Sequence, residues 1–591
     1  METLDWLVIG IFFLALIGII VWVVKQKQND SADYFLGGRD ATWLAIGASI
    51  FASNIGSEHL IGLAGAGASS GMAMAHWEIQ GWMILILGWV FVPFYSRSMV
   101  FTMPEFLERR YNPQSRTILS VISLISYVLT KVAVTVYAGG LVFQQVFGIK
   151  ELWGIDFFWI AAIGLVILTA LYTIFGGMKS VLYTSILQTP ILLLGSLIIL
   201  VLGFKELGGW DEMMRICGAV TVNDYGNTMT ELIRSNNDPN FPWLGALIGS
   251  AIIGFWYWCT DQFIVQRVLS GKNEKEARRG TIFGAYLKLL PVFLFLIPGM
   301  IAFALHQKYL GTGGEGFLPM LANGNANADA AFPTLVAKLL PAGVKGLVVC
   351  GILAALMSSL ASLFNSSAML FTIDFYKRFK PNTSEKKLVG IGQMATVAIV
   401  ILGILWIPIM RSVGDVLYTY LQDVQSVLAP GIAAAFLLGI CWKRTSAQGG
   451  MWGLIAGMII GLTRLGAKVY YSNVGDVSSS TFKYLFYDMN WLFFCGWMFL
   501  FCIIVVIVVS LATSACLQLP QALKRFKGWY SELQLLNKKQ LHVRVGINGI
   551  SFIPLSSWVL LLLFIGISGK SVCCYDIYPC SIPLKQKLRY E

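Results

Sequence analysis

The feature that most constrains the fold is a polar run, SNIGSEH, at residues 53–59 of an otherwise apolar segment from about residue 41 to 68. That segment is long enough to cross a bilayer, which takes about 20 apolar residues. Ionisable groups at membrane depth are costly, and backbone can leave the helix there only where it lines a cavity. Because Gly56 allows a break, the run predicts a discontinuous helix holding a polar site near the midplane, as in many secondary transporters.

The composition indicates a multi-spanning, all-α integral membrane protein. The chain of 591 residues is 57% hydrophobic and only 13% charged, about half the charged fraction of soluble proteins. Residues 6–24 are expected to be a retained span, because they follow acidic residues and lack a small-residue cleavage site. Apolar runs predict about 14 transmembrane helices, near residues 6–24, 41–68, 77–96, 117–147, 155–175, 180–203, 242–262, 280–305, 334–374, 388–410, 413–441, 448–468, 490–515 and 548–568.

The net charge of +12 is distributed along the chain in a way that fits a membrane rather than nucleic acid. Lysine and arginine concentrate in alternate loops, at residues 97–116, 267–279, 377–387, 443–444 and 524–539. This is the positive-inside pattern, and it places the N-terminus outside. We therefore expect a multi-pass protein of the cell (plasma or inner) membrane, with the lipid bilayer as a partner and no nucleic acid. We do not expect an enzyme, and no HExxH motif is present.

Other polar residues also lie at membrane depth. Lys131 is over 20 Å from either end of its span, so it is expected to face a cavity or an acidic partner. Asp261 could be the structural partner of a lysine or of backbone. Gln422 could serve as a helix–helix contact. The run 357–362, MSSLAS, is expected to break the segment 334–374, although membrane serines usually bond their own helix.

Several segments, taken in order, resemble the sodium/solute symporter family, and within it the sodium/glucose cotransporters. They include DYFLGGRDATWLAIGAS (33–49), ASNIGSEHLIGLAGAGASSG (52–71), LTALYTIFGGMKSVLYT (168–184), WYWCTDQFIVQR (256–267) and MSSLASLFNSSAMLFTIDFY (357–376). The resemblance runs nearly end to end, and the segment 256–267 is particularly specific for the sugar-transporting branch.

The resemblance implies a leucine-transporter-like fold with an inverted repeat of five plus five helices. The first repeat would span 41–203 and the second 242–441, joined by an outer loop at 204–241. A first extra span and cytoplasmic entry loop would occupy 1–40, and additional spans and a tail 442–591. The first and sixth core helices would be discontinuous.

The resemblance also implies a sugar pocket and a sodium site. The pocket would be formed by Asn54, His59, Glu78, Lys131, Tyr257, Trp258, Lys288 and Gln422. Sodium would be bound by the carbonyls of Ala52, Ile55 and Ala355 and the hydroxyls of Ser358 and Ser359. The chemistry agrees, since amides and carboxylates bond sugar hydroxyls and hard cations prefer oxygen. Ser185 stands where many relatives carry an aspartate associated with a second sodium site, so we expect one sodium per sugar.

These observations together predict sodium-coupled import of a hexose, glucose or galactose, by alternating access. Two alternatives stay open. The first is another cargo, such as myo-inositol, another polyol or another organic solute, and two lysines in the pocket would make an anion conceivable on charge alone. The second is a sugar sensor that binds solute without transporting it.

Overall fold

The computed structural model describes residues 1–26, 30–56, 58–321, 324–412, 417–474 and 480–513, and within helices it leaves out the side chains of residues 129–130, 409–412, 417–423 and 472–473. The described part is almost entirely helical, with one short hairpin formed by β1 (Glu151–Leu152) and β2 (Ile155–Asp156). The span predicted at 548–568 and the C-terminal tail lie outside the described residues.

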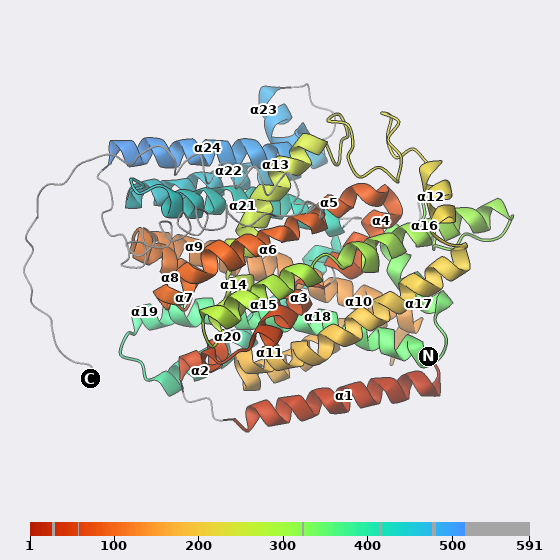
Figure 1. Cartoon of the computed structure of the whole chain (residues 1–591), viewed down its shortest axis with the longest axis horizontal. Helices are drawn as coiled ribbons and strands as arrows, with labels where there is room; N and C mark the ends of the chain where they lie inside the picture. The colour runs from red at the N-terminus through yellow and green to blue at the C-terminus, as the bar shows by residue number, and fades with distance from the viewer. Residues whose placement is uncertain (27–29, 57, 322–323, 413–416, 475–479, 514–591) are drawn as a thin grey trace, which may run out of the picture.

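Ten helical segments of the described chain are long and apolar enough to cross a membrane, and they form an elongated bundle (Figure 1). Within the described residues, the predicted apolar runs from 6–24 to 490–515 lie mainly in helices, but some share one. The runs 155–175 and 180–203 both belong to α11 (Phe157–Leu207), which kinks at Gly177, where φ is +54°. A side chain there would meet the Tyr34 carbonyl at 2.5 Å, so only glycine fits this kink.

The breaks predicted in the first and sixth core helices are present. Helix α3 (Trp43–Asn54) ends at Ile55, whose backbone is extended, and the chain becomes helical again in η2 (Glu58–Leu63) and α4 (Ala64–Ser70). Helix α13 (Trp243–Gly254) continues as η7 (Phe255–Thr260) and stops at Asp261. The Asp261 carboxylate then caps α14 (Gln262–Leu269) by accepting from the Phe263 amide at 3.2 Å. Each break leaves backbone groups free for a site.

The break expected at residues 357–362 is not found. That run lies inside α18 (Val344–Met369), which is continuous and buried along most of its length. Serine hydroxyls do not interrupt the backbone hydrogen bonds of a helix, which explains why this polar run stays helical. The predicted segment 334–374 is divided earlier, between α17 (Ala331–Leu339) and α18, at Pro341 and Gly343, where φ is +79°.

The centre of the bundle is built around α18. It packs against α11, α1 (Thr3–Val24), α10 (Ala133–Phe147), α20 (Glu385–Ser412) and α3, while α3 also packs against α15 (Glu274–Leu287). Helices α21 (Leu417–Cys441), α22 (Ala447–Val474) and α24 (Trp491–Ala512) form a separate group along one side (Figure 1). Exposed apolar side chains on α1, such as Leu14 at 71%, suit contact with lipid.

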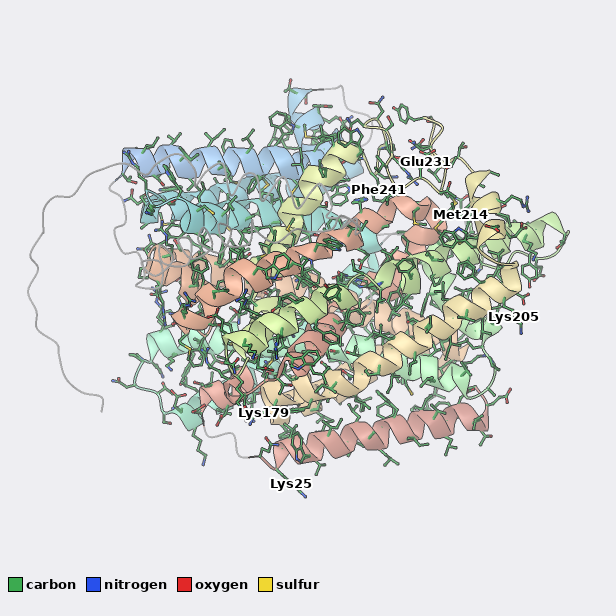
Figure 2. The ribbon with its side chains drawn as sticks, in the orientation of Figure 1. Lys25, Lys179, Lys205, Met214, Glu231 and Phe241 are labelled. Carbon is green, nitrogen blue, oxygen red and sulfur yellow. The ribbon has the colours of Figure 1, made fainter. Side chains whose placement is uncertain are left out.

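The segments expected on opposite sides of the membrane lie apart along the bundle. Along the long axis of the view, Lys25 and Lys179 lie to the left of Lys205 and Met214 (Figure 2). At the outer end, the loop that follows α12 (Trp210–Gly218) packs on the end of α4, where the Met72 amide donates to the Met229 carbonyl at 2.7 Å. The outer loop therefore lies directly over the first broken helix.

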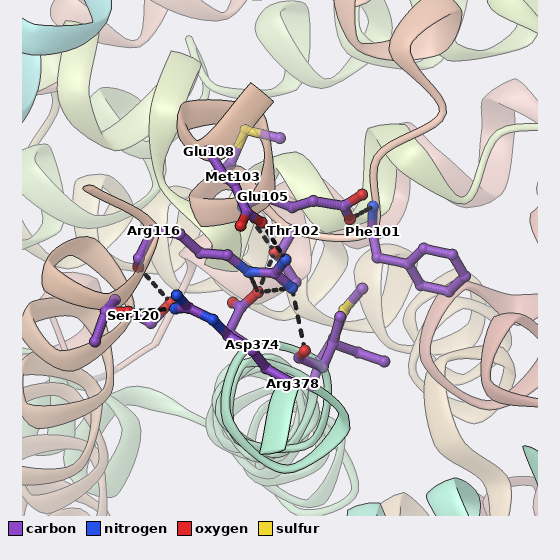
Figure 3. A network of polar contacts seen from close by, with 12 residues as sticks. Phe101, Thr102, Met103, Glu105, Glu108, Arg116, Ser120, Asp374 and Arg378 are labelled. Carbon is purple, nitrogen blue, oxygen red and sulfur yellow. Dashed lines mark hydrogen bonds and ion pairs between the residues drawn. The ribbon is translucent and has the colours of Figure 1, made fainter. Parts of the chain in front are cut away.

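The end of the bundle that the charge pattern assigns to the cytoplasm is held by a polar network centred on Arg116 (Figure 3). Arg116 lies on α9 (Pro113–Ser126) and donates to Asp374 of η10 (Leu370–Tyr376) at 2.7 Å and to Glu108 of α8 (Met103–Arg110) at 2.5 Å. Thr102 donates to the same Asp374 carboxylate at 2.8 Å. The network fastens α8 and α9 to the helix that follows α18.

Candidate solute and sodium site

A buried polar cavity lies where the two broken helices meet α5 (Ala75–Ile79) and the end of α15. It is lined by Asn54, Glu58, His59, Trp77, Glu78, Gln80, Tyr257, Trp258, Lys288 and Gln425. Asn54 comes from the end of α3, Tyr257 and Trp258 come from η7, and Lys288 directly follows α15. Six of the eight residues expected in the sugar pocket therefore line one cavity.

Three ionisable side chains are paired within this cavity. The Lys288 ammonium lies 2.6 Å from Glu78 Oε2 and 2.7 Å from His59 Nε2. His59 Nε2 also lies 3.3 Å from Glu78 Oε1, so the tautomer of the ring decides whether Nε2 accepts from Lys288 or donates to Glu78. His59 Nδ1 has no hydrogen-bond partner among the described residues. It is therefore a buried polar atom available to a bound solute, as a donor or an acceptor according to the tautomer.

Other polar atoms around the cavity are also unpaired. Among the described residues, Asn54 Oδ1 and Gln80 Oε1 have no donor, and Trp258 Nε1 has no acceptor. A buried polar atom without a partner costs about 1–3 kcal/mol, and most such atoms in native proteins have one. With His59 Nδ1, the cavity presents four unpaired polar atoms: two acceptors, one donor and one ring nitrogen that donates or accepts according to its tautomer. This set is complementary to a solute that carries both kinds of group.

Lys131 lies in a neighbouring cavity. Its ammonium donates to Asp261 Oδ2 at 2.8 Å, and the Tyr127 hydroxyl donates to the other oxygen of the same carboxylate. Aromatic rings surround the ammonium at 4.5–5.5 Å, from Tyr127, Trp256, Tyr257 and Phe263. Asp261 is therefore the structural partner of a lysine, which is one of the two roles considered for it from the sequence. Lys131 thus supports the second helix break and lies beside the residues of the first cavity.

The residues expected to bind sodium come together where α3 breaks beside α18. Gly56 lies against Ser359, since a Cβ on Gly56 would be 3.1 Å from Ser359 Oγ. Ser358 Oγ lies 3.3 Å from Ser185 Oγ on α11. Ala52 on α3, Ile55 directly after α3 and Ala355 on α18 are buried. Carbonyl and hydroxyl oxygens from a helix break and a facing helix fit a small hard cation.

Some cavity residues were not among the expected site residues. Gln80 and Glu58 were visible as polar residues at membrane depth, whereas Gln425 was not singled out. Gln425 follows Gln422 by three residues on α21, so helical spacing could have identified it as a neighbour on the same face. The Gln422 side chain itself lies outside the described residues.

Two broken helices that meet at a buried polar cavity inside an apolar bundle define the class of secondary transporters. A family model described as "Sodium:solute symporter family" matches residues 34–457. The chain belongs to the sodium:solute symporter family, and it is a sodium-coupled solute symporter with multiple membrane-spanning helices.

The curated relatives include cotransporters for two kinds of solute. The chain is 39% identical over 479 residues to the sodium/myo-inositol cotransporter 2 of Homo sapiens. The matched region covers 79% of this chain and 70% of that protein. It is 35% identical over 531 residues to the sodium/glucose cotransporter 4 of Danio rerio. This matched region covers 87% of this chain and 79% of that protein. These relatives confirm the family resemblance and sodium as the coupling ion.

Among solved structures, a Na+-coupled sialic acid symporter shares the fold. The match covers 88% of this chain and 100% of that one, with a TM-score of 0.71 and 21% identity. At this identity the likeness shows the fold alone. The leucine-transporter-like fold class is confirmed, while the repeat boundaries at 41–203 and 242–441 stay predictions.

Proposed function

We propose that this symporter imports a hexose, glucose or galactose, by alternating access. The observation that carries the proposal is the set of four unpaired polar atoms, both donors and acceptors, around an aromatic-walled cavity. A hexose ring carries hydroxyls that both donate and accept, and its C–H faces suit aromatic rings. A site that bonds hydroxyls in this way rejects analogues that lack them, because its buried groups would be left unpaired.

Each pocket residue has a role that follows from its contacts. Asn54 Nδ2 donates to the Tyr257 hydroxyl at 3.0 Å, which leaves Asn54 Oδ1 for the sugar. Glu78, His59 and Lys288 would exchange part of their mutual bonding for sugar hydroxyls. Tyr257 lines both this cavity and the deeper one that contains Ser359. Its ring would therefore serve as the inner gate beneath the bound sugar.

Sodium would be bound by the carbonyls of Ala52, Ile55 and Ala355 and the hydroxyls of Ser358 and Ser359. Occupancy would hold the two halves of the first core helix against α18 and so favour sugar binding, and each ligand would raise the affinity of the other by the same factor. With Ser185 in place of an aspartate, one sodium per sugar is expected. A potential of about 100 mV contributes about 2.3 kcal/mol per charge and a tenfold gradient about 1.4 kcal/mol, which together support a sugar gradient of several hundredfold.

The second candidate cargo is myo-inositol or another polyol. Two observations favour it: the same cavity atoms suit any polyhydroxylated ring, and the chain is 39% identical to a sodium/myo-inositol cotransporter. An anionic solute is less favoured, because Lys131 is paired with Asp261 and Lys288 with Glu78. Neither lysine presents an uncompensated charge to a solute.

The test is uptake of labelled glucose, galactose and myo-inositol into proteoliposomes, with and without an inward sodium gradient. The variants are Ser359→Ala and, as a matched control, Ser367→Ala, which removes a buried hydroxyl from the same helix α18. We expect gradient-driven hexose accumulation that Ser359→Ala abolishes and Ser367→Ala leaves intact.

The other outcomes discriminate among the alternatives. Accumulation of myo-inositol in preference to either hexose would make the polyol the cargo. Sugar binding without sodium-driven accumulation would overturn import and favour a sensor. Equal loss in both serine variants would remove the assignment of Ser359 to the sodium site.

A further inference from the structure

A fully buried arginine lies beside the helix break that is proposed to bind sodium. Arg267, on α14, is 0% exposed, and its Nε donates to Ser53 Oγ at 3.1 Å. Ser53 Oγ is in turn 2.7 Å from Ser362 Oγ. Three helices, α14, α3 and α18, therefore meet at one polar contact near the centre of the bundle (Figure 1).

This contact lies on the cytoplasmic side of the proposed sodium residues. By the charge pattern, α3 runs outward from the cytoplasmic side, so Ser53 precedes Ile55 in that direction. Helix α18 runs inward, so Ser362 is about one turn closer to the cytoplasm than Ser358 and Ser359. Arg267 follows the break at Asp261 on an inward-running helix. This contact therefore lies between the proposed sodium residues and the ends of these helices that the charge pattern assigns to the cytoplasm.

The guanidinium is not neutralised by hydrogen bonds. Its Nη1 and Nη2 have no acceptor among the described residues, and one flank lies against the Phe263 ring, 5.0 Å from its centroid. The nearby carboxylate of Asp261 is already engaged by Lys131 and Tyr127. Arginine stays protonated in proteins, and a buried charge acts through a medium of low effective dielectric. Its positive field therefore extends into the space next to the sodium residues.

We propose that Arg267 is the cytoplasmic barrier of the sodium site. Its fixed positive charge keeps sodium from passing inward, as arginines in selective pores exclude cations. Sodium is released only when α14 moves away from Ser53 and Ser362, which happens in the sugar-driven change to the inward-open state. This inference rests on the proposed sodium site, and it explains how sodium flux stays coupled to sugar flux.

The test is uptake of radioactive sodium into proteoliposomes, without sugar, under an inside-negative potassium diffusion potential. Arg267→Gln removes the charge, and we expect its sugar-free sodium leak to rise about tenfold or more, because repulsion at low dielectric is strong. Arg464→Gln is the matched control, since Arg464 is a buried arginine at 1% exposure on α22, away from the site. It is expected to keep the leak of the wild type.

A second variant keeps the proposal falsifiable if Arg267→Gln does not fold. Ser53→Ala retains the charge but removes the hydroxyl that accepts from Arg267 Nε, so a smaller rise in leak is expected. Ser366→Ala is its control, because Ser366 also joins α18 to α14, through Gln266 at 2.7 Å. This control lies further toward the cytoplasm and is expected not to leak.

The outcomes separate this inference from the proposed function. A wild-type leak in Arg267→Gln and Ser53→Ala, with sodium-driven uptake intact, would overturn the barrier and leave the symport function standing. If Ser359→Ala, added to Arg267→Gln in the same chain, suppresses the leak, a sodium path through the sodium site is supported. If the double variant leaks as much as Arg267→Gln alone, the barrier proposal is overturned. Ser359→Ala alone tests the sodium site itself, whatever the leak.

Discussion

The Lys131 ammonium donates a hydrogen bond to the Asp261 carboxylate across 2.8 Å, and both side chains are almost fully buried. This contact joins η6 (Tyr127–Val132) to the residue at which the second broken helix stops. Because Asp261 also caps α14, one carboxylate fixes the geometry of the break and neutralises a lysine at membrane depth. The pair therefore positions Tyr257 and Trp258, which precede the break, against the cavity.

Breaking this pair is expected to destabilise the protein. Asp261→Asn leaves Lys131 as a buried charge without its partner, which costs about 3–5 kcal/mol of unfolding free energy. Adding Lys131→Met to Asp261→Asn removes the stranded charge and should recover much of that loss. Thermal unfolding in detergent measures both effects. A double variant that is no more stable than Asp261→Asn would contradict this role of the pair.

The Tyr257 hydroxyl is expected to act on sugar affinity. Tyr257→Phe removes the acceptor of Asn54 Nδ2, which lies 3.0 Å away. One hydrogen bond contributes about 1 kcal/mol, so the apparent KM for sugar should rise about fivefold while the ring still closes the cavity. Tyr111→Phe is the control, because it deletes a hydroxyl bonded to the Ala435 carbonyl near the cytoplasmic end. Equal KM changes in both variants would speak against a direct role of the Tyr257 hydroxyl.

The cytoplasmic network of Figure 3 is expected to stabilise the closed inner side. Arg116→Gln deprives the buried Asp374 carboxylate of its guanidinium partner. We expect a loss of about 3–5 kcal/mol in stability, together with a higher KM for external sugar as the inward-open state gains population. Glu108→Gln, at a partly exposed carboxylate of the same network, should cost no more than about 1 kcal/mol. Similar losses in the two variants would disprove this ranking.

Asp329 gives a pH-dependent prediction outside the membrane-spanning segments. It lies in η9 (Ala328–Ala330) against Gly65 of α4, and burial raises its pKa from 3.8 to about 6. The folded state then binds more protons than the unfolded state between these values, so stability falls as pH rises through that window. Asp329→Asn should raise the stability at pH 7.5 by roughly 1–3 kcal/mol and make little difference near pH 4. Thermal unfolding at both pH values tests the sign, and a stabilisation that is equal at both would refute it.

Much of the architecture could be predicted from local patterns in the chain. Hydrophobic runs locate helices because each span needs an apolar surface of fixed length. Polar residues beside Gly56 identified the first break, since such groups are tolerated at depth only around a cavity, whereas the break in the sixth core helix was expected from the family resemblance. The serines at 357–362 misled the same reasoning, because hydroxyls bond within a helix and leave its backbone intact.

By itself, the sequence determined that this chain is a multi-spanning helical membrane protein with two broken helices and a sodium:solute symporter motif set. Those features depend on composition and on neighbours in the chain, which a sequence displays directly. Only the tertiary structure decided that Lys288 pairs with Glu78, that Lys131 pairs with Asp261, and that Arg267 donates to Ser53. These contacts join residues 130 to 214 positions apart. They depend on how the helices pack, because the interaction energy of two charges depends on their separation in space and on the local dielectric.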